Sequence, residues 1–186
     1  RINTVANPGT ARQFLRVPRH AIILTSCALL LLTLGCNQSP TVSSRSATPI
    51  RQNGQPPLPT MKLWMGTNEI VAELAMTAQE KADGMMHRTN MGTMEGMLFV
   101  FNRASRQGFW MKSTIVPLDA AYIDPDGVIR EIYPLEPLNE TPVDSDSSDI
   151  QYVLEMNRDW FSNHNVRVGM KIRSEKGSLR DTFFKR

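Results

Sequence analysis

Apolar residues recur in short runs along residues 62–172, and this pattern predicts a mainly β domain. In residues 70–76 every second side chain is apolar, so one face of a strand there is apolar. Residues 96–101 are apolar on both faces, as in a central strand covered on both sides. Further strands are predicted at residues 62–65, 107–111, 118–123, 128–133 and 152–156, and within residues 166–172.

Two short helices are predicted among these strands. Thr77 and Glu80 have the spacing of a capping box, which predicts a helix over about residues 78–86. Asn157 is the predicted cap of a second helix at residues 158–164. Short strands outnumber helices and do not alternate with them. The expected fold is therefore a compact antiparallel β-sandwich or a partly open, jelly-roll-like barrel.

Residues 1–35 are predicted to be an export signal. They contain four arginines and no acid, and residues 21–34 form an uncharged run that is short for a membrane span. Residues 32–36 resemble a bacterial lipobox, at which cleavage leaves Cys36 lipidated. A plain secretory peptide and an uncleaved anchor are the alternatives. The predicted domain has no cysteine, which favours a lipoprotein over a disulfide scaffold.

Lipidation of Cys36 would make the lipid bilayer a partner and hold the domain at the cell envelope. Residues 36–60 are rich in Ser, Thr, Pro and Gln, a composition typical of a flexible tether. Asn37 stands where an aspartate would resemble an inner-membrane retention signal. We therefore expect the periplasmic side of the outer membrane if the cell is Gram-negative. The β domain is predicted at residues 61–172, followed by a polar tail at residues 173–186.

The charge of the predicted domain disfavours nucleic acid as a partner. The whole chain has a formal net charge of +3, but residues 61–172 hold 10 basic and 16 acidic residues, a net charge of −6. A domain of this sign lacks the basic surface that phosphate binding requires. The excess of positive charge lies in the leader and the tail. We expect a monomer.

Several stretches of the domain resemble the motifs of the domain of unknown function 192 (DUF192) family. They are residues 82–88, 95–101, 109–114, 117–119 with 126–127, and 152–155 with 166–170. Ser113 stands where the family usually has asparagine, and Asn165 where it usually has glycine. The resemblance implies a compact, mostly β sandwich in proteins that are often exported. It implies no particular reaction.

The charged residues of these motifs are the candidate ligand-binding residues. Arg88 and Lys112 could bind an anionic group, with Asp119 and Glu155 as bases or orienting groups and Trp110 beside them. The alternative is a set of internal ion pairs that fix loops to the sandwich, since structural ion pairs also hold charges in unusual places.

Three methionines of the motifs, Met86, Met97 and Met111, are candidate metal ligands because thioethers suit Cu(I). The alternative is that these side chains fill irregular gaps in the core. The sequence has no repeated Met motif, no zinc-ligand spacing and no G-x-S-x-G motif. No cofactor is therefore expected.

These observations favour a non-enzymatic, membrane-tethered binding module. Its ligand would be a small anionic or carbohydrate-like molecule or an envelope protein. Two alternatives stay open. One is an enzyme that uses Lys112 with Asp119 or Glu155, and the other is Met-based copper handling.

Overall fold

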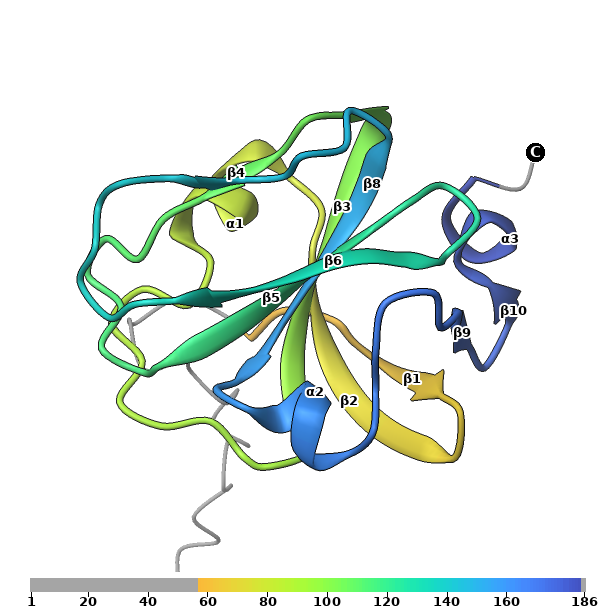
Figure 1. Cartoon of the computed structure of the whole chain (residues 1–186), viewed down its shortest axis with the longest axis horizontal. Helices are drawn as coiled ribbons and strands as arrows, with labels where there is room; N and C mark the ends of the chain where they lie inside the picture. Colours follow the sequence, from red (N-terminus) through yellow and green to blue (C-terminus); the bar gives the residue numbers. More distant parts are fainter. Residues whose placement is uncertain (1–56, 185–186) are drawn as a thin grey trace, which may run out of the picture. The chain divides into compact units, whose positions relative to one another are not determined.

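The structure, a computed structural model, describes residues 57–184 (Figure 1). The predicted export signal and most of the predicted tether lie outside the described residues. The strands are β1 (Thr60–Met65), β2 (Asn68–Ala75), β3 (Glu95–Ser105), β4 (Gly108–Phe109), β5 (Leu118–Ile123), β6 (Ile129–Leu135), β7 (Val143–Asp144), β8 (Ile150–Asn157), β9 (Ile172–Ser174) and β10 (Gly177–Ser178). The helices are α1 (Ala78–Asp83), α2 (Trp160–Asn163) and α3 (Leu179–Phe183). None of these helices is long and apolar enough to cross a membrane.

The described residues are mainly β, as predicted, but the large sheet is mixed. Its eight strands run in the order β10-β9-β1-β2-β3-β8-β5-β6, and β4 pairs with β7 in a separate small sheet. β2 and β3 are parallel because α1 carries the chain back across one face before β3 begins. The predicted mainly β fold class is therefore confirmed, and the structure adds one parallel strand pair and a third short helix.

The large sheet curls without closing into a barrel. Its end strands β10 and β6 do not pair with each other. A single bridge between Val128 and Lys171 joins the start of β6 to the segment before β9. The described domain is thus a strongly curled open sheet, within the range that the sequence predicted.

The capping box predicted for α1 is present. The Thr77 hydroxyl accepts a hydrogen bond from the Glu80 amide at 3.2 Å, and the Glu80 carboxylate accepts one from the Thr77 amide at 2.8 Å. The helix ends at Asp83, earlier than predicted, because Gly84 adopts a φ of 44°. The second helix also begins later than predicted, after Asp159, which has a left-handed backbone conformation.

The folded domain continues beyond Ile172. The segment predicted as a polar tail supplies the end of β9, then β10 and α3, and the Ser178 hydroxyl caps α3 by accepting from the Asp181 amide at 3.0 Å. Leu179 is completely buried in the core. Leu179 is joined by Phe183 and Phe184, which pack against the same core, so a few apolar side chains order a segment whose average composition is polar.

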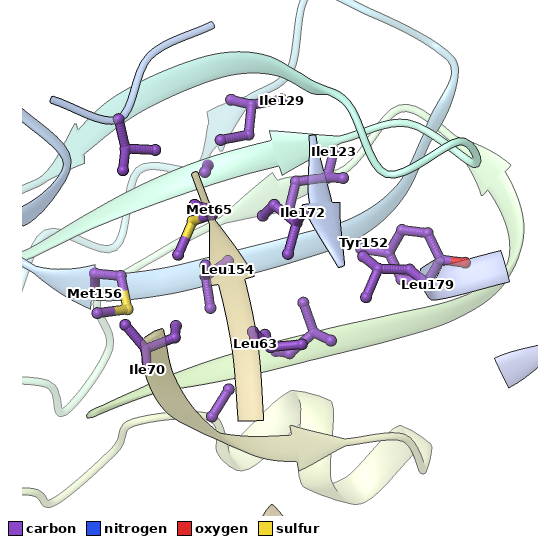
Figure 2. Packing of buried hydrophobic residues seen from close by; sticks show 14 of the residues in the cluster. Leu63, Met65, Ile70, Ile123, Ile129, Tyr152, Leu154, Met156, Ile172 and Leu179 are labelled. Atoms are coloured by element: carbon purple, nitrogen blue, oxygen red, sulfur yellow. The ribbon is translucent and has the colours of Figure 1, made fainter. Parts of the chain in front are cut away.

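Apolar side chains cover both faces of the large sheet. Strand β8 shows this best, because its side chains alternate between the faces. Tyr152, Leu154 and Met156 enter the larger cluster, which β1, β2 and β9 also build (Figure 2). Val153 enters the second cluster with Phe99 of β3. Any polar residue at an inward position of β8 is consequently buried.

We predict that Leu179→Ala lowers the free energy of unfolding by about 2–5 kcal/mol, because it leaves a cavity under α3. Urea denaturation measures the change. Lys176→Ala, an exposed change in the same segment, is the control and should stay within about 0.5 kcal/mol of wild type. Equal stability of the two variants would show that this segment is dispensable.

Candidate ligand pocket beneath helix α1

The register of the sheet places an acidic residue at the centre of its second face. Glu73 of β2 pairs with Met97 of β3, Met97 with Glu155 of β8, and Glu155 with Ala120 of β5. Residues paired in this way project to the same side of a sheet. The row therefore sets Glu155 among apolar neighbours, with Glu73 two strands away.

A cavity of about 130 Å³ adjoins this row. Its wall consists of α1 and the turn after it, β3, the corner around residues 107–114, and Glu155. Four aromatic residues line it, namely Phe99, Phe101, Phe109 and Trp110. Three thioethers do so as well, from Met85, Met86 and Met111. The cavity thus combines aromatic and thioether side chains with polar groups from Lys81, Asp83, Gln107, Thr114 and Glu155, and small-molecule sites use both kinds of group.

Edge-to-face aromatic packing builds the inner wall. The ring centroids of Phe99 and Phe109 lie 4.8 Å apart, and those of Phe101 and Phe109 lie 6.4 Å apart. Gly84 lets the end of α1 approach this wall. A Cβ atom at that position would lie 3.4 Å from the Phe99 ring, and the backbone has positive φ there.

Glu155 contributes a buried carboxyl group to the cavity. The residue is 3% exposed, and its Oε2 atom has no hydrogen-bond partner. Burial raises the pKa of Glu155 to about 8, although the positive charge of Arg88 acts in the opposite direction. The carboxyl group is therefore mostly protonated at neutral pH. A buried polar atom without a partner costs about 1–3 kcal/mol, and a ligand that bonds to it would remove that cost.

Arg88 forms an ion pair with Glu73. Its Nη2 atom lies 2.6 Å from both carboxylate oxygens, and both side chains are partly buried. The pair attaches the loop after α1 to β2 and so holds one side of the cavity. Arg88 acts on Glu155 through its charge, while its guanidinium is bonded to Glu73.

Asp119 lies on the opposite face of the sheet from Glu155, because it pairs with Met156. Its carboxylate accepts from the Asp159 amide at 2.8 Å and lies 3.1 Å from the Arg158 guanidinium. Burial raises the pKa of Asp119, and these two partners oppose that shift. Asp119 thereby fixes the turn into α2 and lies apart from the cavity.

Lys112 is exposed, and its Nζ atom lies 5.4 Å from the centre of the Trp110 ring. Trp110 is 45% exposed and lines the cavity. Of the five candidate ligand-binding residues, the structure brings Trp110 and Glu155 to one cavity. Lys112 stands beside its edge. The proposed pairing of Lys112 with Asp119 is absent, because Asp119 is bonded to Arg158.

Only two of the three candidate copper ligands lie at the cavity. Met86 and Met111 line the cavity, whereas Met97 is fully buried in β3 outside the residues that line it. Met85, which was not among the candidates selected from the sequence, lines it instead. The described residues contain no cluster of three or more His, Cys, Asp or Glu side chains that could hold a metal ion.

Lys81 and Phe101 also lie at the cavity and were missed from the sequence. The Lys81 ammonium donates to the carbonyl oxygens of Met76 at 2.6 Å and Val100 at 3.1 Å, and it lies 5.3 Å from the centre of the Phe101 ring. Burial lowers the pKa of Lys81. The sequence held one signal for an element above this part of the sheet. The strand predicted at residues 96–101 is apolar on both faces, and such a strand requires a cover on its second face.

The fold and this cavity define a mostly β domain with a small internal site. The model of the family DUF192, described as "Uncharacterized ACR", matches residues 61–174. The match covers more than half of the chain, so this protein belongs to the DUF192 family. The resemblance noted from the sequence is therefore confirmed. No curated protein matches the chain.

Two solved structures share the fold. A proposed transcription regulator from Sinorhizobium meliloti is 31% identical, with a TM-score of 0.58, and the match covers 62% of this chain and 92% of that chain. A protein of unknown function from Novosphingobium aromaticivorans is 32% identical, with a TM-score of 0.58. That match covers 62% of this chain and 86% of the other.

The raised pKa of Glu155 predicts how stability depends on pH. Between pH 4.5, the ordinary value for this group, and about 8, the unfolded chain loses the proton and the folded chain keeps it. The stability that this group contributes is therefore complete below the lower value and falls as pH rises through the window. Glu155→Gln removes the titration. The free energy of unfolding of the variant, relative to that of wild type, should therefore rise by up to about 1.4 kcal/mol per pH unit in this window.

Urea denaturation at several pH values measures this difference. Glu140→Gln makes the same chemical change at an exposed position and serves as the control. Parallel pH profiles for Glu155→Gln and wild type would contradict a raised pKa.

Proposed function

We propose that the domain is a non-enzymatic binding module that holds one small chemical group in the cavity beneath α1. The observation that carries the proposal is the Oε2 atom of Glu155, which is buried at an aromatic cavity and has no hydrogen-bond partner. Buried polar atoms in proteins are nearly always bonded. A buried oxygen that lies at a cavity and has no partner within the protein is explained if a ligand donates the missing hydrogen bond.

The size of the cavity limits what it can hold. A dry cavity of about 150 Å³ in another protein accommodates benzene, and the cavity here is about 130 Å³. The site therefore accepts the end of a molecule, about as large as one six-membered ring. Trp110 is exposed at the edge, with Lys112 over its ring, and it offers contact area for the rest of the ligand.

The charges at the cavity favour a neutral or cationic group over the anionic ligand that the sequence suggested. An anion could bind only the protonated form of Glu155, whereas a cation pairs with the ionised form. The guanidinium of Arg88 is bonded to Glu73, and the ammonium of Lys81 is bonded to two backbone carbonyls. A carbohydrate-like ligand stays consistent with the site, because hydroxyl groups can bond to a carboxyl group and sugar rings pack on tryptophan.

The geometry gives the enzyme alternative less support. General acid–base chemistry requires its groups within hydrogen-bond reach of one substrate. Asp119 lies on the other face of the sheet, bonded to Arg158, and Lys112 extends over Trp110. Glu155 alone remains at the cavity. One carboxyl group can bind a ligand without any catalytic partner.

The relative described as a proposed transcription regulator raises DNA as a ligand for this chain. The net charge of −6 over residues 61–172 argues against it, because most affinity for DNA comes from basic side chains at phosphates. We keep the small-ligand function.

We further propose that the module works at the cell envelope, attached through a lipid on Cys36. The support is the lipobox-like run before this cysteine and the Ser/Pro-rich residues that follow it. A tether of this composition would let the cavity face the aqueous phase while the lipid stays in the bilayer.

The cavity predicts binding of small probes. We choose four-carbon compounds that differ in one end group, namely butylammonium, butanol and butyrate, together with methyl glucoside. At least one should shift the methyl NMR signals of the cavity methionines saturably, with a Kd of about millimolar or lower, as such small ligands allow. Absence of saturable shifts with all four would contradict the function.

A matched pair of variants links such binding to the cavity. Ala82 is exposed and lines the cavity edge, so Ala82→Trp should block entry and abolish the shifts with little effect on folding. Ala78 lies one turn earlier on α1, is also exposed and lies outside the residues that line the cavity. Ala78→Trp should bind like wild type.

Lipid attachment predicts that Cys36→Ser moves the protein from the membrane fraction to the soluble fraction of a bacterial host. It should also abolish incorporation of labelled fatty acid. Cys27→Ser, in the apolar run, is the control and should stay lipidated. Labelling that survives Cys36→Ser would contradict the lipobox assignment.

A further inference from the structure

We infer that the cavity beneath α1 is selective for an organic ammonium group, which lies against the carboxylate of Glu155 and the aromatic rings around it. The inference rests on the proposed binding function and adds the chemical class of the ligand. That class includes free amines and the lysine side chain of a partner protein.

The lining of the cavity contains two carboxyl groups. Glu155 presents a buried oxygen without a donor, and an ammonium group supplies donors together with the opposite charge. Asp83, at the end of α1, adds a second carboxylate to the cavity lining. Lys81 is the one basic residue of the lining, and its ammonium is bonded to the carbonyls of Met76 and Val100.

The wall of the cavity is also aromatic. Cations bind to the faces of aromatic rings, and quaternary and methylated ammonium groups are recognised by several rings together. Two rings of the cavity lining already have protein ammonium groups over them. Lys112 lies over Trp110 at 5.4 Å, and Lys81 lies over Phe101 at 5.3 Å. Rings of this lining therefore already contact ammonium groups of the protein itself.

Other titratable groups lie on the elements around Glu155, and Arg88 is the one that acts on its pKa. Arg88 is the basic one and is paired with Glu73. Lys81 and Asp83 lie on α1. Burial raises the pKa of Tyr122 of β5, and the nearby charge of Glu155 raises it further. Burial keeps a proton on Glu155 in the empty cavity. An ammonium ligand replaces it, so the carboxyl O–H bond breaks, the proton enters water, and the carboxylate pairs with the ligand.

The test compares matched probes with the full-length chain. Butylammonium, butanol and butyrate are titrated at pH 7 while the methionine methyl signals are followed by NMR. Butylammonium should bind at least about tenfold more tightly than butanol, and butyrate should bind least, because charge and ring contacts both favour the cation. The affinity for butylammonium should also rise between pH 6 and about 8, the value near which Glu155 titrates, whereas that for butanol should not.

Glu155→Gln should weaken butylammonium about tenfold or more and leave butanol within about twofold. Circular dichroism checks that this variant folds. If it does not, Asp83→Asn at the cavity edge takes its place and should weaken butylammonium about twofold to threefold without affecting butanol. An equal loss for both probes would overturn the inference.

The outcomes separate this inference from the proposed function. If butanol binds as tightly as butylammonium, the binding function stands and the ammonium selectivity is wrong. If no probe binds, both fail. Saturable binding of Ag(I) without binding of butylammonium would replace the inference with a thioether metal site.

Nα-acetyl-lysine methylamide separates the two sources of an ammonium group, which are a lysine of a partner protein and a free amine. Binding equal to butylammonium supports a protein lysine, and weaker binding supports a free amine.

Discussion

The burial of one carboxyl group in a strand that is covered on both faces governs the chemistry of this domain. Strand β8 lies between β3 and β5 and directs Leu154 and Met156 to one core and Glu155 to the other. Glu155 is 3% exposed, so its charged form is disfavoured and its pKa rises to about 8. An apolar residue would fill this position without that cost. A carboxyl group there is best explained by the cavity that it lines.

The cavity exists because of the crossover between the two parallel strands. The chain leaves β2, forms α1 and enters β3 beside β2, so the helix and the turn after it cover the second face of the sheet. Gly84 lets the helix end approach Phe99, and the pair of Arg88 with Glu73 attaches the following loop to β2. The cover is attached at both sides of the cavity, and this arrangement leaves space above Glu155.

Much of this fold follows from the sequence, and the exceptions have physical reasons. The alternating runs, the capping box at Thr77 and the doubly apolar strand at residues 96–101 are local signals, and each was read correctly. The parallel pairing and the ordered segment around Leu179 depend on contacts between distant residues. No local pattern encodes the parallel pairing or the burial of Leu179, although the Ser178 cap of α3 is a local signal.

The candidate site likewise combines residues that local motifs indicate with an arrangement that depends on tertiary contacts. Trp110 and Glu155 were selected from the family motifs and reach one cavity. Asp119 belongs to the same motifs but lies on the other face. It pairs with Met156, the neighbour of Glu155 in β8, and neighbouring residues of a strand point to opposite faces. Strand register decides which motif residues meet, and register is a tertiary property.

The central claim is that Glu155 is a neutral, buried group that a ligand can engage. A ¹³C NMR titration of the Glu155 carboxyl carbon tests it directly, in the absence and presence of butylammonium. The account predicts a titration near pH 8 in the empty cavity, which moves to lower pH when the cation is bound. A titration near 4.5 under both conditions would contradict it.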